Sequence, residues 1–155
     1  GPAPRVPGGR GLVGDADLGG GPWGRVMRDI VASIHPRHAQ AILDGTKTIE
    51  LRKRAPRCAE LIDRMYIYET APTSLVVGRV MVVSIQCLSP DALWMYYGHR
   101  TCVTEAEFFE YFDGHLEAYG IEVAVPRRFI GRWSITDLGL KRPPQSWCYV
   151  PEVSP

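Results

Sequence analysis

A short turn followed by a two-faced strand, residues 44–54, is the feature that most constrains how this chain can fold. Gly45 is typical of a turn or a helix C-cap, because glycine adopts positive φ without steric cost. The residues after it alternate, so Ile49 and Leu51 are expected to share one face of a strand. The run therefore predicts a strand with an apolar face toward a core and a charged opposite face.

The charged face carries Glu50 and Arg52, and Lys47 lies where the turn leads into the strand. Two cations and one anion on a rigid element, braced by buried neighbours, form a candidate binding site. The alternative is a strand whose charges face solvent in an ordinary salt bridge, which contributes little stability. The spacing alone favours this solvated interpretation.

Composition indicates one domain with a substantial core, because 155 residues suffice for one. No apolar run approaches the roughly 20 residues of a membrane span, so no membrane partner is expected. The net charge is +1, and from Arg28 onward the basic and acidic residues balance. Since proteins that bind many phosphates are usually basic, nucleic-acid contact should be local, and a nucleotide fits as well as a polymer.

The four cysteines and four histidines show no metal-binding pattern. There is no C-x-x-C pair, and the histidines lack zinc-ligand spacing. We therefore expect free thiols in a reducing compartment, and neither a metal nor a cofactor. No signal peptide is recognisable at the start of the sequence, which favours a cytoplasmic location.

The first 26 residues differ from the rest of the chain. They are rich in glycine and proline and poor in large apolar residues. Such a segment buries too little surface to offset its ordering entropy, so 1–26 is predicted to be a disordered or loosely docked tail. Gly1-Pro2 is also typical of the remnant of a cleaved purification tag. The folded domain is expected to span residues 28–150.

Helices and strands alternate along that domain. Pro36, Ser89-Pro90 and the capping box Thr104-x-x-Glu107 predict helix starts. The expected helices are 37–43, 90–97 and 104–112, with the aromatic residues of the last one in a core. The expected strands are 29–34, 48–52, 65–70, 75–87 with a bulge or close approach at Gly78, 115–125 ended by Pro126, and 130–138 as a strand or extended loop.

The pattern Gly45-x-Lys47-x-x-Glu50-x-Arg52 resembles the signature of the ASCH domain, a PUA-like β-barrel family. The preceding segment 33–44 is similar to that family's strand, polar-Pro turn and helix. The tail 141–150, which contains Pro-Pro-Gln-Ser-Trp, is similar to the ending of one bacterial branch. The resemblance covers residues 28–150 and implies an α+β fold, a PUA-like small mixed β-barrel with flanking short helices.

The resemblance leaves three functions open. PUA-like barrels commonly bind RNA, so the first is binding of RNA, single-stranded nucleic acid or a nucleotide, which we favour. The second is a hydrolase for a modified nucleoside, as in an ASCH branch that hydrolyses acetylcytidine; Lys47 matches its lysine, but Glu50 replaces its threonine nucleophile. The third, a metal-assisted ribonuclease, ranks last because the sequence shows no carboxylate cluster. Whether the chain is an enzyme stays open.

A pocket formed by the signature strand and the tail is the predicted site. Lys47 can supply a charge for a phosphate or act as a base, and Glu50 can accept from an amine or transfer protons, so these two would be catalytic in an enzyme. For Trp147, stacking on a base and plugging the core remain equally open, and Ser146 is a site or a turn residue. The predicted ligand-binding residues are Lys47, Glu50, Arg52, Arg54, Gln145, Ser146 and Trp147.

Overall fold

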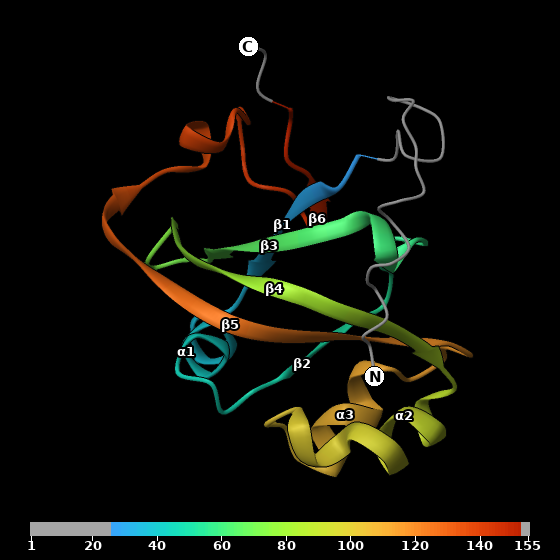
Figure 1. Ribbon diagram of the computed structural model, residues 1–155. Helices are drawn as coiled ribbons and strands as arrows, with labels where there is room; N and C mark the ends of the chain where they lie inside the picture. The colour runs from blue at the N-terminus through green and yellow to red at the C-terminus, as the bar shows by residue number, and fades with distance from the viewer. Residues whose placement is uncertain (1–25, 153–155) are drawn as a thin grey trace.

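A curved sheet of six strands with short helices at one end makes up the computed structural model, which describes residues 26–152 (Figure 1). Of the predicted tail 1–26, all but Val26 lies outside the described residues. The strands are β1 (Arg28–Ile34), β2 (Ile49–Arg52), β3 (Ile62–Glu69), β4 (Leu75–Leu88), β5 (Ala118–Trp133) and β6 (Trp147–Tyr149). The α-helices are α1 (Pro36–Leu43), α2 (Pro90–Tyr97) and α3 (Glu105–Tyr111), and the 3₁₀ turns are η4 (Ala59–Leu61), η5 (Gly98–Arg100) and η6 (Ile135–Leu138).

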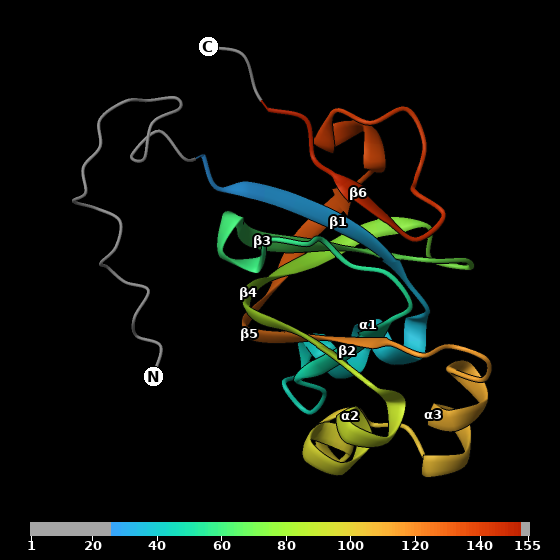
Figure 2. The ribbon, with the colours of Figure 1, turned by 90° about the vertical axis from the view of Figure 1, so that its right-hand side faces the viewer.

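The strands follow the order β2-β5-β4-β3-β1-β6, with β1 and β3 parallel and all other neighbours antiparallel. The sheet curls into a half-barrel (Figure 2), and we call the opening between its terminal strands, β2 and β6, the seam. Arg52 at the end of β2 crosses this seam to hydrogen-bond Ser33 of β1 and Ser146 beside β6. The predicted α+β, PUA-like architecture is confirmed.

Two apolar clusters fill the interior of the fold, and the second of them holds β2 in place. The main core fills the space between α1 and strands β1, β3, β4 and β5. A second cluster joins Ile49 and Leu51 of β2 to Leu93 of α2 and to Phe108 and Phe112 of α3. The second cluster confirms that the aromatic residues of α3 are largely core, and it accounts for the pair of helices below β2 in Figure 1.

The helix starts follow the predicted signals. Ser89 accepts a hydrogen bond from the amide of Ala92, and Pro90 occupies the first turn of α2. Thr104 and Glu107 form the reciprocal capping box of α3. These caps satisfy amide groups that the helix itself leaves unpaired, which explains why the sequence located both helices well.

The predicted strand break at Pro126 is wrong. The strand β5 continues through Pro126 to Trp133, and residues 135–138 form η6 rather than a strand. Val125 has a φ of 53°, and the pairing with β4 shifts by one residue between the Arg127 and Ala124 pairs. Proline is tolerated at such a bulge, because its missing N–H group is not needed in the ladder there.

The close approach predicted at Gly78 is confirmed. A Cβ added there would collide with the backbone oxygen of Arg127 and lie 2.7 Å from Leu43 Cδ2. The pairing of β4 with β5 also shifts between Val76 and Gly78. The strand β3 begins at Ile62, three residues before its predicted start.

All four cysteines are free thiols, as predicted. Among residues 26–152, none of the helices has both the length and the apolar character needed to cross a bilayer.

Candidate functional site

Both faces of β2 are buried, which makes the solvated interpretation of its charges wrong. Ile49 and Leu51 pack against α2 and α3, so the opposite face points into a pocket with a cavity volume of about 440 Å³. Residues of α1, α3 and the C-terminal tail wall this pocket. The exposed fraction is therefore only 2% for Lys47, 5% for Glu50 and 8% for Arg52. Sequence spacing could not reveal these covering segments, since they come from distant parts of the chain.

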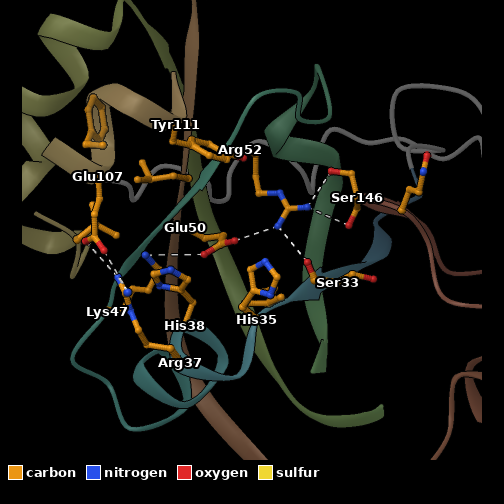
Figure 3. A pocket seen from close by; sticks show the side chains of 15 residues that line it. Ser33, His35, Arg37, His38, Lys47, Glu50, Arg52, Glu107, Tyr111 and Ser146 are labelled. Atoms are coloured by element: carbon orange, nitrogen blue, oxygen red, sulfur yellow. Dashed lines mark hydrogen bonds and ion pairs between the residues drawn. The ribbon is translucent and has the colours of Figure 1, made fainter. Parts of the chain in front are cut away.

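The three charged residues form one ion network on the pocket floor (Figure 3). Glu50 Oε2 lies 3.0 Å from Arg52 Nη1, and Glu50 Oε1 lies 3.9 Å from Lys47 Nζ. Lys47 also donates a hydrogen bond to the backbone carbonyl of Thr101. Two cations thus share one carboxylate, and the buried network carries an excess of one positive charge.

Arg52 ties the tail to the signature strand. Its Nη1 donates to the Ser33 carbonyl at 3.3 Å, and its Nη2 donates to Ser146 O at 3.0 Å and Ser146 Oγ at 2.8 Å. Ser33 Oγ in turn donates to the Pro144 carbonyl at 2.7 Å. The tail residues therefore stand in a fixed position at one wall of the pocket.

The start of α1 supplies the rim opposite the tail. His35 occupies the N-cap position of this helix without a side-chain capping hydrogen bond, and Arg37 and His38 lie in its first turn. Arg37 reaches across to Glu107 of α3 in a paired hydrogen bond of 3.2 and 3.3 Å. In Figure 3 both histidines lie beside Glu50 on the pocket side.

Burial changes the proton affinities of three groups in the pocket: it raises the pKa of Tyr111 and lowers the pKa values of Lys47 and His38. Desolvation lowers the pKa of Lys47, although the carboxylate of Glu50 opposes this shift. Desolvation and the positive charge of Lys47 lower the pKa of His38. His38 Nδ1 is buried and has no hydrogen-bond partner within residues 26–152. A neutral imidazole can accept a proton or a hydrogen bond through its unprotonated ring nitrogen.

Five of the seven residues predicted to bind a ligand come together in this pocket, which we call the Lys47 pocket. They are Lys47, Glu50, Arg52, Gln145 and Ser146. The other two, Arg54 and Trp147, line a second hollow. Trp147 also packs against the main core. It therefore both contributes to the core and lines a hollow.

Sequence reasoning missed the part of the pocket rim that α1 and α3 contribute. The spacing of His35 and His38 excludes a zinc site but does not indicate a place in the pocket. Their position shortly before the signature strand is the sequence signal that could have placed them there. Glu107 and Tyr111 carried no signal, because only folding brings α3 to the pocket. Within the described part of the chain, no three His, Cys, Asp or Glu residues are grouped so that they could hold a metal ion.

The ASCH domain family model matches residues 33–131. A protein of Zymomonas mobilis subsp. mobilis named as an ASCH domain-containing ribonuclease is 36% identical over 87 residues, which cover 56% of this chain and 58% of that relative. The match thus spans little more than half of the relative's length.

Solved structures of an ASCH protein from Zymomonas mobilis are similar in fold. A mutant form has a TM-score of 0.73 at 28% identity and covers 81% of this chain and 89% of that one. The unmutated form has a TM-score of 0.71 at 27% identity, with the same coverage.

Proposed function

This chain belongs to the ASCH domain family, and from that membership we propose that it binds single-stranded RNA and holds one nucleotide in the Lys47 pocket. The relative from Zymomonas mobilis, which is named as a ribonuclease, supports RNA as the partner. The pocket supports a nucleotide-sized ligand, because about 440 Å³ lies in the range of small-molecule sites.

The excess positive charge of the pocket floor is the observation that carries this proposal. Lys47 and Arg52 are both buried and share the single carboxylate of Glu50. A buried charge without a counter-ion is costly, so the pocket favours an anion beside Lys47. A phosphate group of the RNA backbone supplies that anion.

The tail completes the pocket with groups suited to a base. Gln145 offers both a donor and an acceptor, and Ser146 Oγ lies beside it. Single-stranded RNA presents such base edges, because its bases can turn out of the stack. The balanced charge from Arg28 onward agrees with contact to few phosphates.

The test is a comparison of two lysine variants by fluorescence anisotropy with a labelled single-stranded RNA. Lys47→Met should weaken binding about tenfold or more, a loss of about 1.4 kcal/mol, because it removes the charge that meets the phosphate. Lys141→Met, at an exposed position outside the pocket, is the matched control and should bind like the wild type. A salt titration should give a shallow slope. Unchanged affinity of a folded Lys47→Met variant would refute the proposal.

Cleavage of the bound strand is a second candidate, favoured by the imidazole of His38, which lines the same pocket as Lys47 and has a lowered pKa. In this reaction His38 takes the proton of a ribose 2′-hydroxyl, whose oxygen attacks the adjacent phosphorus. The bond to the 5′-oxygen breaks, and that oxygen takes a proton from Lys47, whose lowered pKa eases the transfer. The products are a 2′,3′-cyclic phosphate and a 5′-hydroxyl; His38 then releases its proton to water, and Lys47 takes up a proton from water.

Mass spectrometry of the products distinguishes the chemical possibilities. The cleavage described above requires cyclic phosphate ends and must fail on a strand whose ribose at the cut is 2′-deoxy. Cleavage that stops on addition of a chelator would instead indicate a metal-assisted ribonuclease. Release of acetate from acetylcytidine would indicate the hydrolase for a modified nucleoside.

A further inference from the structure

A second hollow, with a cavity volume of about 1040 Å³, lies beyond the contact between Arg52 and Ser146. We call it the aromatic hollow. Its polar and aromatic walls include Arg28, Arg54, Arg57, Tyr119, Trp147 and Tyr149. The Lys47 pocket uses none of these residues.

The short strand β6 directs two aromatic rings into this hollow. Trp147 and Tyr149 are two residues apart and therefore share one face of the strand, while Cys148 packs into an apolar cluster behind it. The two rings meet edge to face, with centroids 5.4 Å apart. Tyr149 remains 39% exposed. Such rings are platforms on which bases of any kind can stack.

Cations surround these rings. The Arg28 guanidinium lies 4.2 Å from the centre of the Tyr149 ring, and its buried Nε has no partner within the described residues. Arg54 and Arg57 are exposed, and neither forms an ion pair in the part of the chain that the structure describes. Glu117 is the single carboxylate that lines the hollow. The hollow thus carries three arginines against one carboxylate, although the charges from Arg28 onward balance overall.

The hollow and the Lys47 pocket lie on the two sides of one contact along the seam. Arg52 and Ser146, which are bonded to each other, line the pocket, while Arg54 and Trp147, two residues and one residue further along the chain, line the hollow. Along β1, Ser33 belongs to the pocket and Arg28 to the hollow, a separation of roughly 16 Å at 3.3 Å per strand residue. A short single strand can therefore reach both.

We propose that the aromatic hollow binds the nucleotides that flank the one in the Lys47 pocket, on the same RNA strand. This inference rests on the proposed function. Trp147 and Tyr149 stack on the flanking bases, and Arg54 and Arg57 contact their phosphates. Each stacked base should raise affinity about 5- to 150-fold, so a hexanucleotide binds more tightly than a mononucleotide.

Cysteine alkylation provides a test with an internal control. Cys58 and Cys87 are exposed thiols that line the hollow, whereas Cys102 is an exposed thiol that lines neither cavity. A saturating uridine hexanucleotide should slow the reaction of Cys58 and Cys87 with iodoacetamide about fivefold or more, and leave Cys102 unchanged. Uridine monophosphate should protect none of the three, because it fills only the pocket. Mass spectrometry of the alkylated peptides measures each rate.

Two double variants complement the cysteine alkylation experiment. Arg54→Gln with Arg57→Gln should lower the affinity advantage of the hexanucleotide over uridine monophosphate about fivefold or more. Arg127→Gln with Arg132→Gln removes two exposed arginines that line neither cavity and should preserve that advantage.

The outcomes separate this inference from the proposed function. If the hexanucleotide binds, depends on Lys47 and yet protects neither Cys58 nor Cys87, the aromatic hollow is not a nucleotide site and the proposed function stands. If the hexanucleotide does not bind at all, both are overturned.

Discussion

Replacing Glu50 with glutamine isolates the role of the one buried carboxylate between two buried cations. The change preserves shape and removes only the negative charge. At an effective dielectric constant of about 20, the attraction of Glu50 is about 5 kcal/mol to Arg52 at 3.0 Å and about 4 kcal/mol to Lys47 at 3.9 Å. Desolvation of the three ions offsets much of this attraction, so Glu50→Gln should lower the free energy of unfolding by about 3 to 5 kcal/mol.

Urea denaturation monitored by tryptophan fluorescence measures this loss. The matched control is Glu107→Gln, which breaks the exposed pair with Arg37 while glutamine still completes the capping box. Its expected cost is less than about 1 kcal/mol. Adding Lys47→Met to Glu50→Gln should restore part of the stability, because it removes one of the two uncompensated cations. The electrostatic account is refuted if Glu50→Gln costs no more than Glu107→Gln, or if the second change deepens the loss.

Two further outcomes follow from other parts of the fold. Gly78→Ala should destabilise the protein by about 1 to 3 kcal/mol in the same denaturation assay, because its Cβ would meet the Arg127 backbone; a neutral effect would contradict the close packing of β4 on β5 there. Burial lowers the pKa of His38 below 6.5, so the unfolded chain binds the proton more readily and wild-type stability falls as pH drops below about 6.5. In His38→Gln this contribution is absent. As pH falls from about 8 to about 5, the free energy of unfolding of the wild type should therefore decrease relative to that of the variant. If the difference between the two free energies stays constant over this range, the lowered pKa of His38 is contradicted.

The sequence predicted those parts of the fold whose causes are local. Ser89-Pro90 and the box of Thr104 and Glu107 define helix starts through contacts within a few residues, and the structure contains both. The strand break expected at Pro126 is absent because proline's effect depends on its place in the ladder: within a bulge, its missing N–H group is not needed for pairing. The alternation around Glu50 predicted the two faces of β2 but not the burial of the charged face, which depends on α1, α3 and the tail.

The candidate site follows the same division. Lys47, Glu50 and Arg52 were identified because they lie within six residues of one another, and the resemblance to a known tail added Gln145 and Ser146. The contribution of Glu107 and Tyr111 arises only when the chain between β4 and β5 folds back over β2. The separation of Arg54 from Arg52 into different cavities likewise depends on where the tail crosses the seam.

The seam across which Arg52 reaches from β2 to Ser33 and Ser146 has a consequence for solubility. β2 and β6 are the edge strands of the sheet. The outer edge of such a strand carries unpaired backbone groups, with which strands of other molecules can pair. The Arg52 guanidinium bridges these two edges through its bonds to Ser33 and Ser146, and it also lines the Lys47 pocket. Replacing Arg52 to admit a bulkier ligand therefore also exposes the two sheet edges to self-association. Variants at Arg52 need screening for aggregates before any loss of binding is interpreted.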